Sequence, residues 1–253
     1  MNPHKHHDPD HKREHVHIHA QHYEKDKGAS RQWLFIGVAL LVVALVYSGV
    51  LLVRAKARSS AVTALEVSPL QFDASHDDLG IASGEANAPV VVREFADFQC
   101  PACGGFEPVL EQMRKDYVDT GKVRFVFFDL PLEDIHKNAM IAAQVARCAG
   151  TQQHYWQMHD LLYAKQAEWG ESKDPMDTFL TYGTGLGLDN GRMMGCIRTG
   201  AMHQDVVRSQ AYGEAMGMHS TPTFAVNDQA VVGGASYADL KALIDSQLAA
   251  AKH

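Results

Sequence analysis

The sequence predicts an α/β domain with an inserted all-helical subdomain, and three observations support this fold class. An apolar strand pattern at residues 90–98 leads through a turn into a helix pattern at residues 104–117. Helical periodicity without strand patterns fills about residues 133–217. Strand patterns return at residues 221–232, before a closing amphipathic helix. Strands on both sides of a helical stretch are expected to form one sheet, with the helices packed around it.

The first 31 residues form a polar segment that holds eight of the 15 histidines. Such a composition cannot build a core, so we expect a disordered tail over residues 1–31. His15, His17 and His19 alternate there, and imidazoles in this pattern bind zinc, nickel or copper loosely. The alternative is a solvated tail that binds metal only incidentally.

An uncharged apolar run of 21 residues follows at residues 33–53. As a helix it would be about 30 Å long, which matches the hydrocarbon thickness of a bilayer. Trp33 suits one interface, and Arg54, Lys56 and Arg58 close the other end. This basic cluster argues against a cleaved signal peptide, and the lack of a polar face argues against a buried core helix. We therefore expect a transmembrane anchor over residues 32–53.

The charge distribution bears on partners and on orientation. The formal net charge is -7, and the excess of acidic residues lies in the part that follows the anchor. An acidic domain is a poor partner for nucleic acid. Basic residues flank the apolar run almost equally on both sides, so orientation rests on the cysteine chemistry described below. An exchanging dithiol suits an oxidising compartment, which predicts a cytoplasmic tail and a periplasmic catalytic domain on the inner membrane.

Residues 54–87 are interpreted as a linker with a possible first strand near residues 65–72, and residues 88–253 as the main domain. The strand pattern at 90–98 is almost continuously apolar, as in a buried parallel strand. Glu94 interrupts it, six residues before Cys100. A buried carboxyl there is able to take the proton of Cys103. The alternatives are an exposed edge residue or an ion pair with a Lys or Arg.

Two cysteines three residues apart, Cys100 and Cys103, stand between this strand and the following helix. Free N–H groups and the dipole at a helix start favour thiolate, and lower a cysteine pKa from ~8.5 to roughly 3.5–7.5. The thiolate is the attacking species in thiol–disulfide exchange, which needs no dissociable cofactor. Half of a zinc site is the alternative. Cys148 and Cys196 each lack a Cys or His within two to four residues, so we favour redox chemistry.

The remaining elements follow from turn signals. A second strand is expected at residues 122–129. The helical stretch is divided into four or five short helices by breaks at Gly150-Thr151, at Trp169-Gly170, at residues 173–175, at residues 183–187 and at Gly200. Asn227 and Asp228 stand between two short apolar runs, as in a tight hairpin, and a helix is expected at residues 237–251.

These elements, in this order, resemble the DsbA-like thiol–disulfide oxidoreductases of the bacterial cell envelope, which have the thioredoxin fold. The resemblance covers residues 88–250 and is carried by five stretches: EFADFQCPAC at 94–103, Pro108, RCAG at 147–150, HYWQMHDLL at 154–162 and STPTF at 220–224. It implies a four- or five-stranded sheet with a helical insertion, and Cys100 as the nucleophile.

The same resemblance assigns further residues. Pro222 is expected to be a cis-proline facing the dithiol, with the backbone of Thr221 free to pair with a substrate strand. Pro108 is expected to kink the helix. Cys148 and Cys196 are expected to form a structural disulfide, with two separate buried thiols as the alternative. Ala102 departs from the strongly oxidising members, which carry His at that position, and so leaves the direction of electron flow open.

We therefore expect a membrane-anchored protein that exchanges disulfides with unfolded or thiol-containing exported proteins. The interpretation favours disulfide formation. Cys100 would form the mixed disulfide, Cys103 would resolve it with Glu94, and a membrane partner would re-oxidise or re-reduce the dithiol. One alternative is an envelope disulfide reductase or isomerase. Another, from a different class, is a metal-handling protein built on the His-rich tail.

Overall fold

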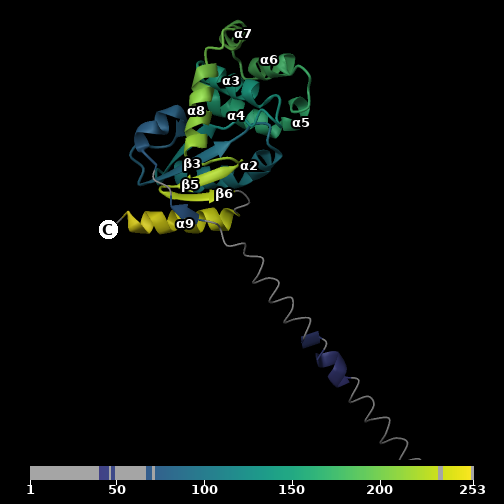
Figure 1. The fold of residues 1–253 in the computed structure, drawn as a ribbon, viewed down its shortest axis with the longest axis vertical. Coiled ribbons are helices and arrows are strands. Elements are labelled where there is room, and N and C mark those ends of the chain that lie inside the picture. The colour runs from purple at the N-terminus through teal and green to yellow at the C-terminus, as the bar shows by residue number, and fades with distance from the viewer. Residues whose placement is uncertain (1–39, 46, 49–66, 70–71, 233–235, 252–253) are drawn as a thin grey trace, which may run out of the picture. The chain divides into compact units, whose positions relative to one another are not determined.

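The computed structural model describes residues 40–45, 47–48, 67–69, 72–232 and 236–251 (Figure 1). The chain divides into two compact units, Met1–Ala64 and Leu65–His253. In the first, residues 40–45 and 47–48 are helical and their large apolar side chains are exposed. The predicted anchor falls mostly outside the described residues, and the His-rich tail falls entirely outside them. Within the described part, no helix has both the length and the apolar character needed to cross a membrane.

The second unit is built on a six-stranded sheet in the order β1-β6-β5-β3-β4-β2. Its central strands β3 and β4 are parallel, and the other neighbouring pairs are antiparallel. The strands are β1 (Val67–Pro69), β2 (Ile81–Ser83), β3 (Val90–Ala96), β4 (Val123–Asp129), β5 (Thr223–Val226) and β6 (Gln229–Val232). The two longest strands lie at the centre, where both faces are covered, which explains their almost unbroken apolar sequence.

Helices cover both faces of this sheet. They are α2 (Pro101–Met113), α3 (Ala139–Gly150), α4 (Tyr155–Ala164), α5 (Gln166–Trp169), α6 (Met176–Gly185), α7 (Asn190–Arg198), α8 (His203–Ala215) and α9 (Tyr237–Ala250). A 3₁₀ helix η1 (Ala74–Leu79) precedes β2, and a π-helical turn η2 (Arg114–Val118) extends α2. Figure 1 shows α3 to α7 gathered at one end of this unit and α9 at the other.

Side chains of β3 alternate between two separate apolar clusters. Val92 belongs to the larger cluster, which includes residues of α2, α4 and α9. Phe95 points to the other face, where its ring stacks on Phe128 at 4.7 Å and lies 6.3 Å from the ring of Tyr212 on α8. Because successive strand residues face opposite sides, Glu94 lies on the same face as Val92, beneath α2.

The charged neighbour of Glu94 lies on the opposite face and is fully paired there. The guanidinium of Arg93 donates to both carboxylate oxygens of Asp77 at 2.6 and 2.8 Å. Its Cζ also lies 5.0 Å from the ring centroid of Phe72. Arg93 is therefore not available to Glu94.

The structure differs from the sequence expectation mainly at the sheet edges. The family resemblance implied four or five strands, whereas the described residues form six. β1 lies within residues 65–72, where a possible first strand was expected, and β2 is a three-residue strand that was not expected. The helical stretch contains six helices rather than four or five, because the turn at Lys165 separates α4 from α5.

Candidate active site

Cys100 is the N-cap residue of α2, just before its first helical residue, in extended backbone conformation with φ -67° and ψ 121°. Pro101 occupies the first helical turn, where a missing N–H costs nothing. Cys100 retains 7% exposure, whereas Cys103 is fully buried one turn later. The dithiol thus presents one sulfur at the surface and one beneath it, which is the arrangement that stepwise exchange requires.

Asp97, buried in the turn between β3 and α2, organises this turn. Its Oδ1 accepts the backbone N–H of Gln99 at 2.7 Å. Its Oδ2 accepts the N–H of Leu132 at 2.9 Å and lies 2.8 Å from Nδ1 of His136. One carboxylate therefore ties the turn before Cys100 to the loop after β4.

The helical insertion supports the same turn from the other side. Gln166, at the start of α5, donates from Nε2 to the carbonyls of Phe98 at 2.7 Å and of Cys100 at 2.9 Å. Gln99 donates to the carbonyl of Gly170 at 2.7 Å. These bonds satisfy backbone groups that a buried loop would otherwise leave unpaired.

The surroundings of Cys100 stabilise its thiolate. Hydrogen bonds from the Cys103 thiol, from Thr221 and from the backbone N–H groups of Cys103 and Ala102 lower the pKa of Cys100 to about 5, although burial opposes the shift. These N–H groups belong to the first turn of α2, where a helix has donors to spare. At neutral pH the surface sulfur is therefore an anion.

Cys103 is shifted the opposite way. Burial is the main cause that raises its pKa, and the neighbouring Cys100 and the charge of Glu94 raise it further. The second sulfur thus stays protonated unless a base removes its proton. This asymmetry assigns the first attack to Cys100 and makes the second attack depend on proton transfer.

Glu94, the predicted proton acceptor, is fully buried on β3 between Phe127 and Phe224 of the flanking strands. Neither of its carboxylate oxygens has a hydrogen-bond partner among the described residues. Burial is the first cause that raises its pKa well above normal, and the charge of Glu107 adds to the rise, while Arg114 lowers it. The expected alternatives for Glu94, an edge position or a direct ion pair, do not apply.

Thr221 and Pro222 stand directly across from the dithiol. Their peptide bond is cis. The Sγ of Cys100 lies 3.5 Å from the carbonyl oxygen of Thr221, and Pro222 immediately precedes β5. Pro108 lies inside α2, five residues before the helix ends at Met113.

Other residues singled out in the sequence lie elsewhere. Cys148 and Cys196 are joined by a disulfide between α3 and α7, across a sequence separation of 48. His15, His17 and His19 fall outside the described residues. The disulfide belongs to the helical insertion and is not part of the dithiol site.

Three further side chains near the dithiol were not predicted as functional. They are Glu107 on α2, Arg114 on η2 and Tyr163 on α4. The charge of Glu107 raises the pKa of Glu94, and the charge of Arg114 lowers it. Burial raises the pKa of Tyr163, and the charges of Cys103, Glu94 and Glu107 raise it further. Helical spacing offers a signal for one of them. Glu107 follows Cys103 by four residues and so shares its face of the helix.

A possible cation cluster lies at the outer edge of this region. Ligand atoms of Glu107, His159 and Asp160 lie within 4.8 Å of one another. Arg114 already occupies their vicinity, however. Its guanidinium lies 3.5 Å from Glu107 and 3.0 Å from Asp160. Because Arg114 already neutralises the carboxylates of Glu107 and Asp160, the cluster does not support a metal site.

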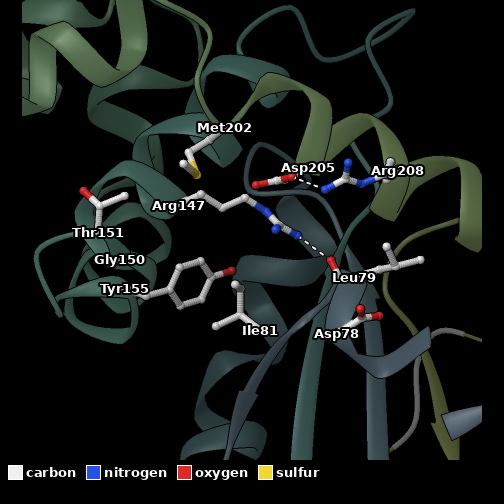
Figure 2. A pocket seen from close by; sticks show the side chains of 10 residues that line it. All are labelled: Asp78, Leu79, Ile81, Arg147, Gly150, Thr151, Tyr155, Met202, Asp205 and Arg208. Carbon is white, nitrogen blue, oxygen red and sulfur yellow. Dashed lines mark hydrogen bonds and ion pairs between the residues drawn. The ribbon is translucent and has the colours of Figure 1, made fainter. Parts of the chain in front are cut away.

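A cavity of about 560 Å³ lies among α3, α8 and the approach to β2 and shares no lining residue with the dithiol site (Figure 2). Its buried Arg147 is paired with Asp129 at 2.5 Å and donates to the carbonyl of Leu79 at 2.8 Å. Arg208 is paired with Asp205. Since Arg147 and Arg208 are already paired with carboxylates, the cavity offers no unpaired cation to an anionic ligand.

A model of the thioredoxin family matches residues 77–246. Among curated relatives, a Na(+)/H(+) antiporter NhaA 1 of Salinispora arenicola is 36% identical over 168 residues, which are 66% of this chain and 24% of the antiporter. The chain thus spans about a quarter of such relatives. Disulfide bond formation protein D of Bacillus subtilis is 27% identical over 177 residues, 65% of this chain and 75% of that protein.

Solved structures resemble the same region. Oxidised BdbD from Bacillus subtilis superposes with a TM-score of 0.65 at 22% identity, covering 72% of this chain and 98% of that one. α-DsbA1 from Wolbachia pipientis gives 0.61 at 20% identity, covering 72% and 95%. These likenesses concern the fold. They extend over almost the whole length of BdbD and of α-DsbA1, and over 72% of this chain.

Proposed function

The chain belongs to the thioredoxin family, and on that premise we propose that it is a protein thiol–disulfide oxidoreductase that acts through Cys100 and Cys103. Two relatives point to this activity within the family: the protein of Bacillus subtilis carries the name disulfide bond formation protein D, and a further one of Bacillus anthracis is 36% identical over 84 residues and carries the same name with "probable". The proposal does not extend to ion transport, because the chain spans only a quarter of the antiporters.

The observation that carries the proposal is the opposite environment of the two sulfurs. Cys100 has a pKa of about 5, whereas burial raises the pKa of Cys103. Cys100 forms the mixed disulfide with the substrate. To form a disulfide, a substrate thiolate attacks Cys100 in the Cys100–Cys103 disulfide, and Cys103 leaves as a thiolate that takes up the proton of Glu94. A second substrate thiolate then attacks the substrate sulfur of the mixed disulfide and releases Cys100 as a thiolate. In the reverse direction Glu94 accepts the proton of Cys103, and the Cys103 thiolate attacks the Sγ of Cys100 in the mixed disulfide and releases the substrate thiolate. The backbone of Thr221, which lies beside Cys100 just before β5, is the place where a substrate strand would pair.

The proposed direction is disulfide formation. Stabilising the thiolate stabilises the reduced form, and this makes the disulfide a stronger oxidant. Thioredoxin, with a pKa near 7 and about -270 mV, and DsbA, with about 3.5 and about -120 mV, define a scale. On this scale a Cys100 pKa of about 5 lies between the two, on the oxidising side of thioredoxin.

Equilibration of the purified domain in glutathione buffers tests this proposal. A potential more positive than the about -270 mV of thioredoxin, together with oxidation of a dithiol peptide that is lost in Cys100→Ala, is the expected result. A potential near -270 mV would favour the alternative of a reductase or isomerase. A protein that neither oxidises nor reduces the peptide would refute both directions.

The proposed substrates are unfolded or thiol-containing exported proteins, with a membrane partner that returns the dithiol to its starting state. We further propose that residues 32–53 anchor the catalytic domain on the extracytoplasmic side of the inner membrane. The apolar length of this segment supports the proposal. Membrane fractionation of the full chain, followed by protease treatment of intact spheroplasts, tests it. Protection of the catalytic domain from the protease would contradict the orientation.

A further inference from the structure

One side chain of the helical insertion reaches the backbone of the nucleophile itself. Gln166, the first residue of α5, donates from Nε2 to the carbonyl of Cys100 at 2.9 Å and to the carbonyl of Phe98 at 2.7 Å. The Cys100 carbonyl also accepts the N–H of Gly104 at 3.2 Å, and the Cys100 N–H donates to the carbonyl of Asp97 at 3.0 Å. The peptide groups on both sides of Cys100 are therefore held. Of these contacts, those of Gln166 come from outside the turn and α2.

The segment that carries Gln166 is itself anchored. Trp169 at the end of α5 is fully buried, and its Nε1 donates to a carbonyl of α4 at 2.9 Å. The carbonyl of Gly170 accepts Nε2 of Gln99 at 2.7 Å and Nδ2 of Asn138 at 3.0 Å. A side chain on an anchored segment loses little freedom when it makes its hydrogen bonds, so the Gln166 amide is preorganised for the turn before α2.

The lack of a side chain at Gly104 leaves the space in which this amide lies. A Cβ on Gly104 would lie 3.1 Å from Oε1 of Gln166 and 3.5 Å from its Cδ and Nε2. The neighbouring Gly105 differs, because a Cβ there would meet nothing within 4 Å. Glycine inside a helix is destabilising relative to alanine, so a helical glycine calls for a reason. At Gly104 the close approach of the Gln166 amide provides one.

The orientation of the Cys100 peptide decides where its sulfur lies. Cys100 is in extended conformation, whereas the residues after it are helical. Its thiolate is supported by the N–H groups of Ala102 and Cys103 in the first turn of α2. A rotation of the peptide between Cys100 and the helix would move the sulfur relative to these donors. A contact that fixes the Cys100 carbonyl therefore also fixes the environment of the thiolate.

We propose that Gln166 is a positioning residue for disulfide exchange, which holds the Cys100 carbonyl and thereby keeps the Cys100 sulfur at the N–H groups of the first turn of α2. The inference rests on the proposed exchange function. In the step concerned, the Cys100 thiolate attacks one sulfur of a peptide disulfide and forms a bond with it, and the other peptide sulfur leaves with the electron pair as a thiolate. Gln166 touches none of the reacting atoms. It sets how strongly the attacking thiolate is stabilised.

The pKa of Cys100 in the reduced protein, followed by thiolate absorbance from about pH 3 to 9, reports this contact. Gln166→Met keeps the length of the side chain and removes both donated hydrogen bonds, so it is expected to raise the Cys100 pKa by about one unit. Gln166→Glu adds a negative charge near the thiolate and is expected to raise the pKa further. Because a less stabilised thiolate makes a weaker oxidant, the reduction potential is expected to become more negative in both variants.

A matched glutamine provides the first control. Gln210 on α8 is also half-buried and donates from Nε2 to a backbone carbonyl, that of Pro131 at 3.1 Å, in the loop after β4. Gln210→Met removes the same kind of hydrogen bond at a place that does not touch Cys100. It is expected to leave the Cys100 pKa and the reduction potential at their wild-type values.

The two adjacent glycines of α2 provide the second control. Gly104→Ala adds a methyl group against the Gln166 amide and is expected to raise the Cys100 pKa by about half a unit, whereas Gly105→Ala is expected to leave it unchanged. Both substitutions bring the same gain in helix propensity, so the difference between them isolates the contact. In a Gln166→Ala background, which leaves room for the methyl group, Gly104→Ala is expected to add nothing.

A wild-type Cys100 pKa in Gln166→Met, or an equal rise in Gln210→Met, would overturn the inference. Equal shifts in Gly104→Ala and Gly105→Ala would also overturn it, as would a Gly104→Ala shift that persists in the Gln166→Ala background, because the effect would then not pass through the amide. Failure of the proposed function looks different. In that case the wild-type protein would titrate as an acidic thiol but would neither oxidise a dithiol peptide nor reduce a peptide disulfide.

Discussion

The acidity of Cys100 has a consequence for stability as well as for chemistry. Its pKa in the folded protein, about 5, lies below the ordinary value of 9.0 that an unfolded chain retains. A depressed pKa contributes stability that is fully present above the unfolded value and is lost as the pH falls through the folded value. The reduced protein is therefore expected to gain stability relative to the oxidised protein as the pH rises from about 5 to 9.

Urea unfolding of both redox forms across this pH range measures the effect. Glu94 is present in both forms, so its raised pKa largely cancels in the difference. Burial raises the pKa of Cys103 in the folded protein, so this thiol affects the stability difference only at pH values near 9.0 and above, where the thiol of the unfolded chain ionises. A difference between the two forms that stays flat from pH 5 to 9 would mean that the Cys100 thiolate is not stabilised by the fold.

Ala102 offers a second test of the dithiol. It is exposed in the first turn of α2, and its backbone N–H already supports the Cys100 thiolate. Ala102→His adds a cationic side chain there, which should lower the Cys100 pKa by about one unit and make the potential more positive by about 30 mV. Ala102→Gln is the neutral control and should change neither value. Thiolate absorbance and glutathione equilibria provide the two readings.

The sequence predicted the parts of the site that sit in or beside the cysteine motif. Cys100, Cys103 and Glu94 are linked by short spacing, and Pro222 was placed by the family resemblance. Glu107 shares the helix face of Cys103, but its importance depends on the packing of η2 and α4 against α2, which bring Arg114 and Tyr163 near. Spacing along one element cannot reveal contacts between elements.

The packing of α8 on the sheet depends on a glycine. A Cβ on Gly213 would lie 3.0 Å from Cδ1 of Phe95 and 3.3 Å from Cδ1 of Leu130, both fully enclosed. Phe95 is held by stacking on Phe128, so it has little room to yield. Gly213→Ala is therefore expected to incur an overpacking cost of about 1–3 kcal/mol.

Gly105 on α2 provides the matched control, because a Cβ there would meet nothing within 4 Å. Both substitutions gain about 1 kcal/mol of helix propensity, so their difference in unfolding free energy isolates the clash. Gly105→Ala should stabilise the protein and Gly213→Ala should be less stable than Gly105→Ala by about 1–3 kcal/mol. Equal stabilities would show that α8 is free to move away from the sheet.

Element boundaries followed breakers where the chain has them. The sequence placed breaks at Gly150, Trp169 and Pro175, and in the structure α3 ends at the first, α5 ends at the second and α6 begins after the third. Strand β2 has no comparable signal. It comprises three residues, and its existence depends on pairing with β4, which lies some forty residues further along the chain.

Two helices of the helical insertion, α3 and α7, are joined by a disulfide bond as well as by packing. The Cys148–Cys196 disulfide joins α3, whose apolar face is buried, to α7 near the outer end of the insertion. α3 also packs against α4 and α8, and α5 reaches the Cys100 turn through Gln166. The insertion therefore supports the dithiol through α5, while the disulfide acts at a different point.

Removal of this disulfide should separate stability from chemistry. A loop with a sequence separation of 48 restricts the unfolded chain, and the chain-entropy model gives ~4 kcal/mol for its closure. The double substitution Cys148→Ala and Cys196→Ala is expected to lower the free energy of unfolding by about 2–5 kcal/mol. The Cys100 pKa and the rate of attack on a peptide disulfide should remain at wild-type values at temperatures where the variant is folded.

Wild-type protein in which the Cys148–Cys196 disulfide is reduced keeps both side chains and lacks the bond, so it shows whether the loss comes from the bond or from the buried side chains. A reduced wild-type protein as unstable as the double variant would assign the loss to the bond. A changed Cys100 pKa in the folded double variant would contradict the separation, because it would mean that the disulfide reaches the dithiol through α3, α4 and α5. In that case the insertion would act as one rigid body, and its covalent tie would be part of how the protein tunes its first sulfur.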